Sequence, residues 1–404
     1  MDFFQELRHT WDKKTLLAIA VMCFLWSVSS LMVFSILPVF MTEELKITTY
    51  TLGWIEGIAV SLAFVAKILS GILSDYIKQR RVLLIAGTFL SICFKALFAL
   101  ATGGLSIFIA RSCDRLAKGV RTAPVDALIA DLYPKENHGM SYGIRQFFYI
   151  MGSVIGSLIA ALLLYFGASY RFVFWCSLVP VSLALMIIIR FVHDAPQAFT
   201  SLHSKFEWHW QDLKNLPNTF WHIILVSFIL MLARFSDSFL ALKARDVGLS
   251  LASLPLFLMG YELTHALVSL PIGWLADRKH RKNILFYGII VLVLANLIMI
   301  QANNPILILL GYLMGGLHMG MTQSLMSTLI AENTNPNLRG SAFAIFYFTT
   351  GLAVLIANPL AGYLSYYYAN AAAPFWGGFI FSGLAAVSLA YPIRAQYHIH
   401  KPII

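Results

Sequence analysis

The chain has 404 residues and a formal net charge of +10; apolar residues make up 59% of it and charged residues only 12%. A soluble domain carries about 25% charged residues, so this composition excludes an ordinary globular protein and predicts one that lies in lipid. The basic excess does not indicate nucleic-acid binding, because the basic residues stand in short loops between apolar runs, as the positive-inside rule expects.

Twelve apolar segments are each long enough to cross about 30 Å of hydrocarbon as a helix. The first set covers roughly residues 16–41, 51–74, 82–101, 105–130, 140–166 and 170–191. The second set covers roughly residues 218–244, 251–275, 284–301, 305–331, 341–365 and 374–394. The polar stretch between the sets predicts three parts: an N-terminal bundle (1–191), a cytoplasmic linker (192–217) and a C-terminal bundle (218–404).

The loops predict the orientation of these segments. Basic residues gather in alternate loops, such as Lys78 to Arg81 and Arg278 to Lys282. The intervening loops, such as 102–106 and 167–169, are short and almost uncharged. Because basic loops stay on the cytoplasmic side, both termini are expected to be cytoplasmic. The first apolar stretch is longer than that of a signal peptide, which predicts a transmembrane helix and not a cleaved leader.

One loop motif occurs twice, between two apolar segments in each half of the chain. The first copy reads Gly71-Ile-Leu-Ser-Asp75-Tyr-Ile-Lys-Gln-Arg80-Arg81, and the second reads Gly273-Trp-Leu-Ala-Asp277-Arg278-Lys279-His280-Arg281-Lys282. The segments 126–131 and 327–332 also match, at nearly the same offset of about 200 positions. Such a repeat indicates two homologous halves in parallel order, an architecture typical of secondary transporters.

This duplicated loop resembles the signature of the major facilitator superfamily, G-x-L-x-D-R-x-G-R-[RK], which follows the second and the eighth helix. The second copy is nearly complete, with His280 in place of a glycine, whereas Tyr76, Lys78 and Gln79 depart from the pattern in the first. The resemblance implies an all-α membrane protein of 12 transmembrane helices, in which two six-helix bundles are related by pseudo-two-fold symmetry.

The resemblance also implies a cytoplasmic gate. Its aspartates would oppose a helix N-terminus of the other half, and its arginines would pair with nearby acids. The expected gate residues are Gly71, Asp75, Arg80, Arg81, Gly273, Asp277, Arg278 and Arg281. Arginines that serve only as topology-setting charges are the alternative, which leaves the glycines and aspartates unexplained.

The fourth apolar segment and the residue after it contain Asp114-Arg115-Leu-Ala-Lys118-Gly119-Val-Arg121-Thr-Ala-Pro124-Val-Asp126-Ala-Leu-Ile-Ala-Asp131. This run resembles a bacterial branch of the superfamily with the pattern D-R-x-G-K-G-x-R-x-A-P-R-D-A-L-I-A-D, from which Ala117 and Val125 depart. It predicts a multi-pass protein of a bacterial inner membrane. Lys118, Arg121 and Asp126 lie near the cytoplasmic end of this segment and are expected to join the gate. The alternative is an ion-pair ladder within the helix, Asp114 with Lys118 and Arg121 with Asp126, which only fastens it.

Charged residues within the spans are functional candidates, because charge is costly inside a membrane. The basic residues there outnumber the acids, which favours an anionic solute such as a carboxylate or a phosphate. The expected substrate-binding residues are Arg111, Arg115, Arg145, Tyr149, Arg234 and His318. His318 stands among glycines and is equally consistent with simple packing.

Carboxylates at membrane depth are candidates for carrying a proton, since burial and a neighbouring cation act on them in opposite directions. Asp237 ranks first, because Arg234 precedes it by three residues on the expected helix. Glu262 ranks second, and His265 lies at i+3 from it, where the two can share a proton or form a neutral buried pair. Glu56 ranks third.

We therefore predict a monomeric transporter that moves a small polar, anionic organic solute by alternating access, coupled to protons, with the lipid bilayer as its surroundings. A carboxylate metal chelate such as a siderophore is one candidate solute. No cofactor, metal site or enzymatic activity is expected. A multidrug efflux antiporter is the first alternative, although only Gly152 and Gly156 of the antiporter motif are present. A membrane-embedded enzyme or a non-transporting sensor is the second. Import and export both stay open.

Overall fold

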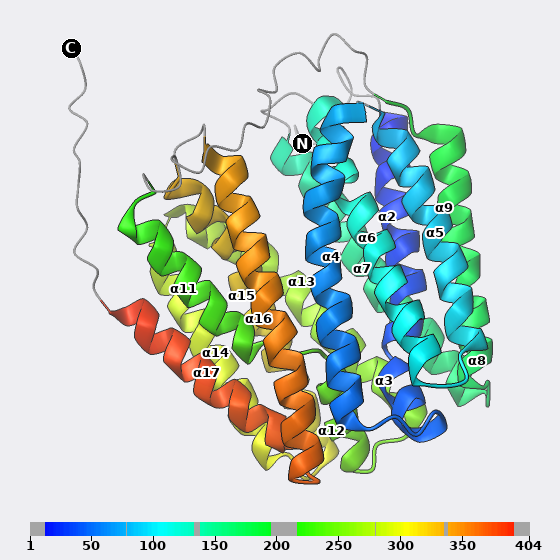
Figure 1. Cartoon of the computed structure of the whole chain (residues 1–404), viewed down its shortest axis with the longest axis vertical. Coiled ribbons are helices and arrows are strands. Elements are labelled where there is room, and N and C mark those ends of the chain that lie inside the picture. The colour runs from blue at the N-terminus through cyan, green and yellow to red at the C-terminus, as the bar shows by residue number, and fades with distance from the viewer. Residues whose placement is uncertain are drawn as a thin grey trace, which may run out of the picture.

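The computed structural model describes residues 13–77, 79–132, 138–194, 216–278, 280–334 and 338–391. These residues form helices joined by short connections, and no strand occurs among them (Figure 1). The cytoplasmic linker predicted for 192–217 falls mostly outside the described residues. The helices before and after it form two groups, called here the N-terminal half and the C-terminal half.

The N-terminal half contains six spans. The first is irregular: α2 (Lys13–Phe34) is followed by α3 (Leu37–Val39) and a π-helical turn (Phe40–Glu44). The others are α4 (Thr49–Ile77), α5 (Arg80–Leu100), α6 (Gly104–Leu132), α7 (His138–Tyr165) and the pair α8 (Tyr170–Cys176) and α9 (Leu178–Phe191).

The C-terminal half repeats this arrangement with another six spans. Its first span is again irregular, consisting of α11 (Asn218–Ala233) and α12 (Ser238–Asp246). A 3₁₀ turn (Leu251–Ser253) leads into α13 (Leu254–Arg278), and then come α14 (Arg281–Gln301), α15 (Pro305–Glu332), α16 (Arg339–Tyr367) and α17 (Ala373–Ala390). The twelve predicted spans are thus confirmed among the described residues.

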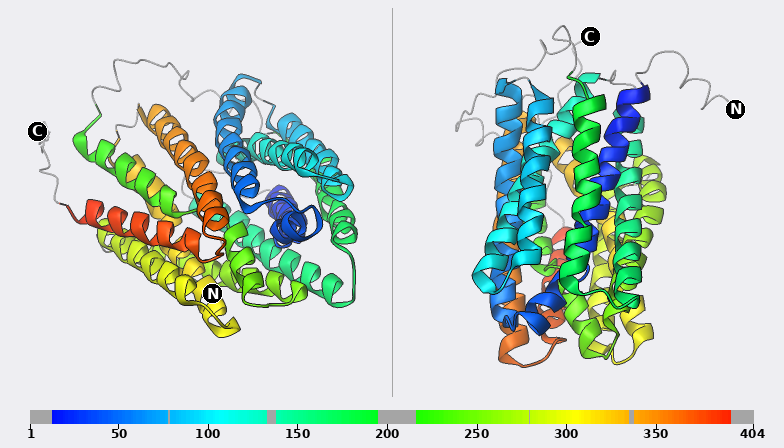
Figure 2. Two further views of the ribbon diagram at one scale, coloured as in Figure 1. Left: turned by 60° about the horizontal axis from the view of Figure 1, so that its bottom comes forward. Right: turned by 90° about the vertical axis from the view of Figure 1, so that its right-hand side faces the viewer.

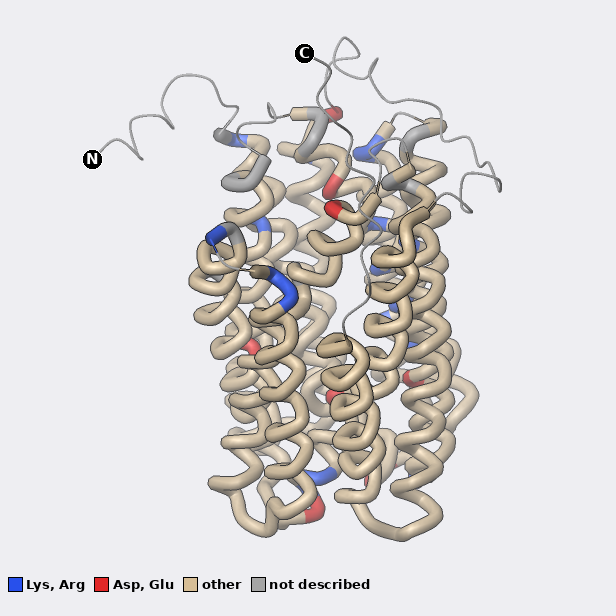
Figure 3. The backbone as a smooth tube through the Cα atoms, turned by 90° about the vertical axis from the view of Figure 1, so that its left-hand side faces the viewer, with Lys and Arg blue, Asp and Glu red and all other residues tan. Residues whose placement is uncertain are grey.

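Eleven of these spans are apolar enough to be recognised by hydropathy, and α6 is the exception. This 29-residue helix carries a charged side chain at almost every turn. Since charged side chains are rare where a helix faces lipid, α6 has to lie against other protein. It does so, packed between α4 and α5. Lys and Arg accordingly occur within the bundle as well as at its ends (Figure 3).

The two ends of the bundle differ in their connections. We call the end where α9 finishes and α11 begins the linker end, and the other, where α2 leads into α4 through residues 45–48, the opposite end (Figure 2). The halves meet through α4 against α16 and through α7 against α13. Both contacts join elements far apart in the sequence.

Small residues allow the helices to approach closely, which is how helices associate where lipid removes the hydrophobic driving force. A Cβ on Gly152 would lie 2.3 Å from the carbonyl oxygen of Phe24, and one on Gly156 would lie 2.4 Å from that of Val28. These two glycines therefore serve to pack α7 on α2. The same holds between the halves, where a Cβ on Gly53 would lie 2.4 Å from the carbonyl oxygen of Asn358.

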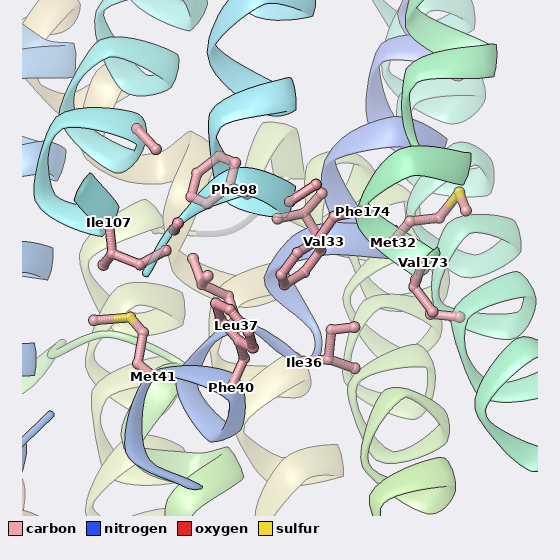
Figure 4. Packing of buried hydrophobic residues seen from close by; sticks show 14 of the residues in the cluster. Met32, Val33, Ile36, Leu37, Phe40, Met41, Phe98, Ile107, Val173 and Phe174 are labelled. Carbon is pink, nitrogen blue, oxygen red and sulfur yellow. The ribbon is translucent and has the colours of Figure 1, made fainter. Parts of the chain in front are cut away.

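An aromatic cluster holds the irregular end of the first span in place (Figure 4). Phe40 from the π-helical turn meets Phe174 edge-on, with ring centroids 5.1 Å apart, and Phe98 lies 6.2 Å from Phe174. All three side chains are fully buried. The cluster fixes the position of the following residues Glu43 and Glu44 at the opposite end.

Candidate functional site: a central cavity between the halves

The seventh span is interrupted near its middle. Helix α11 ends at Ala233 and α12 begins at Ser238, and the residues between them are not helical. The backbone N–H of Ser236, freed by this break, donates to Oδ1 of Asn358 on α16 at 2.7 Å. The Ser236 hydroxyl donates to Oε2 of Glu56 on α4 at 3.2 Å. Broken backbone in a membrane needs such partners, and broken helices commonly form transporter binding sites.

A cavity of about 520 Å³ lies beside this break. Its size falls in the range of pockets that hold small organic molecules. Most of its lining comes from the C-terminal half. The N-terminal half contributes Glu56, Val60, Phe64 and Lys67 from α4 and Arg115 from α6. The cavity is thus formed by both halves, as an alternating-access site has to be.

Arg234, at the end of α11, lines the cavity and is held by neutral groups. Its Nε donates to Nε2 of His318 at 2.8 Å, and its guanidinium also bonds the hydroxyl of Thr322. Nδ1 of His318 lies 2.6 Å from the carbonyl oxygen of Gly288. Since arginine can only donate, Nε2 must accept and Nδ1 must carry the proton, which makes His318 neutral. The charge of Arg234 is therefore not balanced by these partners.

Arg111 and Glu56 form a buried ion pair, with Nη2 and Oε2 2.7 Å apart. Their exposed fractions are 3% and 1%. The guanidinium also lies over the ring of Phe34, 4.0 Å from its centroid. The sequence assigned Arg111 to the substrate and Glu56 to the proton; the structure brings them together, so each is already engaged by the other.

Arg115 lies one turn after Arg111 on α6, and it lines the central cavity. It lies 4.7 Å from the centroid of Phe34, and its Nε has no hydrogen-bond partner among the described residues. Lys67 of α4 is a further cation in the lining, and its ammonium donates to the hydroxyl of Tyr347 at 3.1 Å. Lys67 was not among the site residues predicted from the sequence. The sequence did contain a signal for it, because the spacing of Lys67 from Glu56 places both side chains on one face of α4.

Asp237 lies at the end of the break and is exposed to the cavity. The expected pairing with Arg234 is wrong: the helix is broken between them, so the i+3 spacing no longer brings them together, and Arg234 turns to His318. Among the described residues, no cation lies within ion-pair distance of Asp237. Longer-range charges that act on it come from Glu56, Glu262, Arg111 and Arg115.

The other proton candidates, Glu262 and His265, lie together on α13 as their spacing predicted. Nδ1 of His265 and Oε2 of Glu262 are 3.8 Å apart, and both side chains are largely shielded. Glu262 is also close enough to Tyr149 on α7 to interact electrostatically across the boundary between the halves. Neither member of the pair is among the residues that line the central cavity.

Other charges of α6 pair with neighbouring helices. Arg145 of α7 holds Asp126 at 2.6 Å, and Lys118 donates to the hydroxyl of Tyr149 at 3.2 Å. Asp114 is 3.9 Å from Lys95 of α5 and accepts from the hydroxyl of Ser91. The ion-pair ladder within one helix, considered as an alternative, is therefore wrong, because these side chains reach neighbouring helices.

Arg145 and Tyr149 do not line the central cavity. They belong, with Lys118 and Arg121, to a second and smaller cavity inside the N-terminal half. Arg121 lies over the indole of Trp26 in this cavity, 4.6 Å from the ring. Of the expected substrate residues, Arg115, Arg234 and His318 thus line the central cavity, Arg145 and Tyr149 line the second, and Arg111 lines neither.

The duplicated loops lie at the linker end. The side chains of Asp75 and Asp277 are outside the described residues. In the first copy, Arg80 bonds the hydroxyl of Ser74, and the backbone N–H of Arg81 donates to Oδ1 of Asp194 at 2.8 Å.

In the second copy, Arg281 forms an ion pair with Glu332, and Arg278 stacks on Trp274 at 3.8 Å. A Cβ on Gly71 would meet Ala123 at 3.9 Å, and one on Gly273 would meet open space. The gate role of these loops stays a prediction.

The two halves are held together at the opposite end. Nε of Arg245, on α12, lies 2.5 Å from Oε1 of Glu43, which precedes α4. Gly53 of α4 and Gly362 of α16 also face each other so closely that a Cβ on Gly362 would lie 3.0 Å from the Gly53 Cα. The central cavity is thus closed on this side.

A sequence model of the Major Facilitator Superfamily matches residues 15–242 and again 223–402. The chain belongs to this superfamily. It is 28% identical over 349 residues to an uncharacterized MFS-type transporter of Methanocaldococcus jannaschii, a match that covers 84% of this chain and 86% of the relative. The protein is therefore a membrane transporter of a small solute and not an enzyme.

Solved structures agree on the fold. A point mutant of the nucleoside transporter NupG has a TM-score of 0.77 at 14% sequence identity, over 93% of this chain and 98% of that one. A D-xylose-proton symporter has a TM-score of 0.75 at 16% identity, over 94% and 98% of the two chains. At this level of identity the likeness concerns the fold, so the choice of solute has to be argued from the cavity.

Proposed function

We propose that this transporter carries a small organic anion through the central cavity together with a proton. The observation that carries the proposal is the distribution of cations: Arg115 and Lys67 from the N-terminal half and Arg234 from the C-terminal half face one cavity. An anion bound between them would contact both halves at once. Such a bridging ligand can couple its own binding to the rocking of the halves.

The bonding state of these cations supports an anionic solute. Among the residues that the structure describes, Arg234 is bonded only to the neutral groups of His318 and Thr322, and Nε of Arg115 has no partner. A carboxylate or phosphate accepts two parallel hydrogen bonds from a guanidinium, which makes it the natural complement. Glu56 cannot neutralise either cation in the same way, because Arg111 holds it.

Asp237 supplies the link to protons. Its carboxylate shares the cavity with the proposed anion, so the two negative charges repel each other. Protonation of Asp237 removes this repulsion, and by reciprocity a bound anion favours the protonated form. The proton and the anion would therefore load and unload together, which is symport. Carboxylate metal chelates, siderophores among them, are members of this substrate class.

The test is counterflow in proteoliposomes that contain the purified full-length protein. A panel of mono-, di- and tricarboxylates, organic phosphates, ferric chelates, nucleosides and cationic dyes is offered. We expect an anion to exchange, and we expect Arg115→Gln and Arg234→Gln each to weaken its binding at least tenfold, since losing one partner of a buried charge-assisted contact costs about 2–5 kcal/mol.

Arg190→Gln is the control, because Arg190 is exposed at the end of α9 and lies outside the cavity. It should bind the substrate normally. Exchange of a permanent cation in preference to every anion, as in multidrug efflux, would refute the proposal. So would full activity of both cavity variants.

A further inference from the structure

The second cavity lies within the N-terminal half, between α2, α6 and α7. Its volume is about 140 Å³, several times the space that one water molecule occupies. Ten residues line it, and three of them are cations: Lys118, Arg121 and Arg145. No carboxylate is among these ten, and the nearby Asp126 is engaged with Arg145. The lining therefore carries a clear excess of positive charge.

Two hydrogen-bond donors in this lining are buried and unpartnered. The indole Nε1 of Trp26 and Nη1 of Arg121 have no hydrogen-bond partner among the described residues. Their side chains are only 5% and 4% exposed. Buried donors are normally satisfied, so an unpaired charged donor beside an unpaired indole N–H calls for a ligand that accepts from both. Stacking of Arg121 on the Trp26 ring, at 4.6 Å, holds the two donors side by side.

Further donors face the same space. Within the described part of the chain, the ammonium of Lys118 has one bond, to the hydroxyl of Tyr149 at 3.2 Å, and Gln146 adds an amide to the lining. An ammonium carries three donors, so two are left for a ligand. An acceptor-only group with several oxygens would match this set, because every charged group in the lining can only donate.

We propose that this cavity is a binding site for a small oxyanion of phosphate or carboxylate type, separate from the substrate site. The two cavities are one turn of α6 apart: Arg115 lines the central one and Lys118 the second. The site joins α2, α6 and α7 through a common ligand. An occupant would thus neutralise the linker-end charges of α6 and bind this half together.

The test uses the full-length protein in nanodiscs, with inorganic phosphate and sulfate as probes and chloride at matched ionic strength as the reference. Binding is measured by calorimetry and by the shift in apparent melting temperature. We expect phosphate or sulfate to bind and chloride to have no comparable effect. Trp26→Phe keeps the stacked ring and removes the N–H, so it should weaken binding about tenfold. Arg121→Gln should weaken it at least as much.

Arg115→Gln is the matched control, because it removes a cation of the central cavity one turn away. Oxyanion binding should be unchanged in this variant, while transport of the substrate is impaired. The two proposals can therefore fail independently. Equal binding by the wild type and Trp26→Phe, loss of binding in Arg115→Gln, or no binding of either probe beyond the chloride reference would overturn the second site. Trp26→Phe keeps the test decisive if Arg121→Gln does not fold.

Discussion

At the scale of single residues, the sequence indicated which charges matter but not which charges meet. Arg111, Arg115 and Arg234 were chosen as intramembrane cations, and the structure places the last two in the central cavity. The pairing of Arg111 with Glu56 could not be predicted, because it joins residues far apart in the chain and no local spacing encodes it. His318 was left between ligand and packing residue; its contacts make it the support of Arg234.

The buried Arg111–Glu56 pair should make the stability of the protein sensitive to the loss of either member alone. Arg111→Gln and Glu56→Gln each leave one buried charge alone, and such a loss typically costs about 3–5 kcal/mol. The double variant Glu56→Gln/Arg111→Gln removes both charges and should be more stable than either single variant. Apparent melting temperatures in detergent measure this. Additive effects of the two substitutions would contradict the pairing.

Asp237 is the residue on which proton coupling should depend. Asp237→Asn keeps the size of the side chain but fixes it in a neutral form. Transport driven by a pH gradient should be abolished, while exchange of substrate at equal pH on both sides is retained. Uptake of the identified substrate into proteoliposomes, with and without an imposed gradient, measures both. Glu262→Gln, on the neighbouring α13, is the comparison variant. If Asp237→Asn keeps gradient-driven transport at the wild-type rate and Glu262→Gln loses it, then Glu262 and not Asp237 is the proton carrier.

At the scale of elements, the predicted ends of the twelve spans lie close to those of the structure, although α6 is not apolar enough for hydropathy alone to recognise it. The span predicted at 51–74 is α4 (Thr49–Ile77), and the one at 305–331 is α15 (Pro305–Glu332). The break in the seventh span was missed. Hydropathy averages over about 20 residues and is blind to a local loss of backbone hydrogen bonds. The partner that makes this break tolerable, Asn358, comes from a different helix.

Asn358 should therefore be required for the shape of the substrate site. Asn358→Leu keeps the branched shape of the side chain but cannot accept from the backbone N–H of Ser236, and an unpaired buried donor costs about 1–3 kcal/mol. We expect lower thermal stability and impaired substrate binding, because the break positions Arg234 and Asp237. Thr350→Val is the control: Thr350 also lies on α16 and lines the cavity, but its hydroxyl bonds only its own helix. Equal binding by both variants would show that the break does not depend on Asn358.

At the scale of the whole molecule, the two halves are joined by contacts of different kinds. The sequence pointed to the linker end, where the duplicated loops predict a gate. The structure shows that the opposite end is closed, by the ion pair of Glu43 with Arg245 and by the contact of Gly53 with Gly362. Neither contact was foreseen, because a glycine has no side chain to mark a meeting point and the partner of Glu43 lies far away in the sequence. Alternating access requires that this closure be reversible.

Substitutions at the opposite end should consequently shift the molecule toward a state that is open there. Gly53→Val places branched carbons where even a Cβ would lie 2.4 Å from the carbonyl oxygen of Asn358, so α4 and α16 cannot close. Glu43→Gln should have a weaker effect, since a partly exposed ion pair contributes about 0.2–1 kcal/mol, which changes the population of states by fivefold at most. Gly351→Ala is the control on α16, because its Cβ would make an ordinary contact with Phe64 at 3.4 Å.

The readout of this shift is the accessibility of the central cavity from each side of the membrane. Val60 lines the cavity, and Val60→Cys introduces a label site there once Cys23, Cys93, Cys113 and Cys176 have been replaced. A membrane-impermeant maleimide added on the side of the opposite end should react faster in Gly53→Val than in the parent, slightly faster in Glu43→Gln, and at the parent rate in Gly351→Ala. If Gly53→Val folds and labels at the parent rate from that side, the Gly53–Gly362 contact is not part of the closure. The cavity would then have to be sealed there by other residues of α4 and α16.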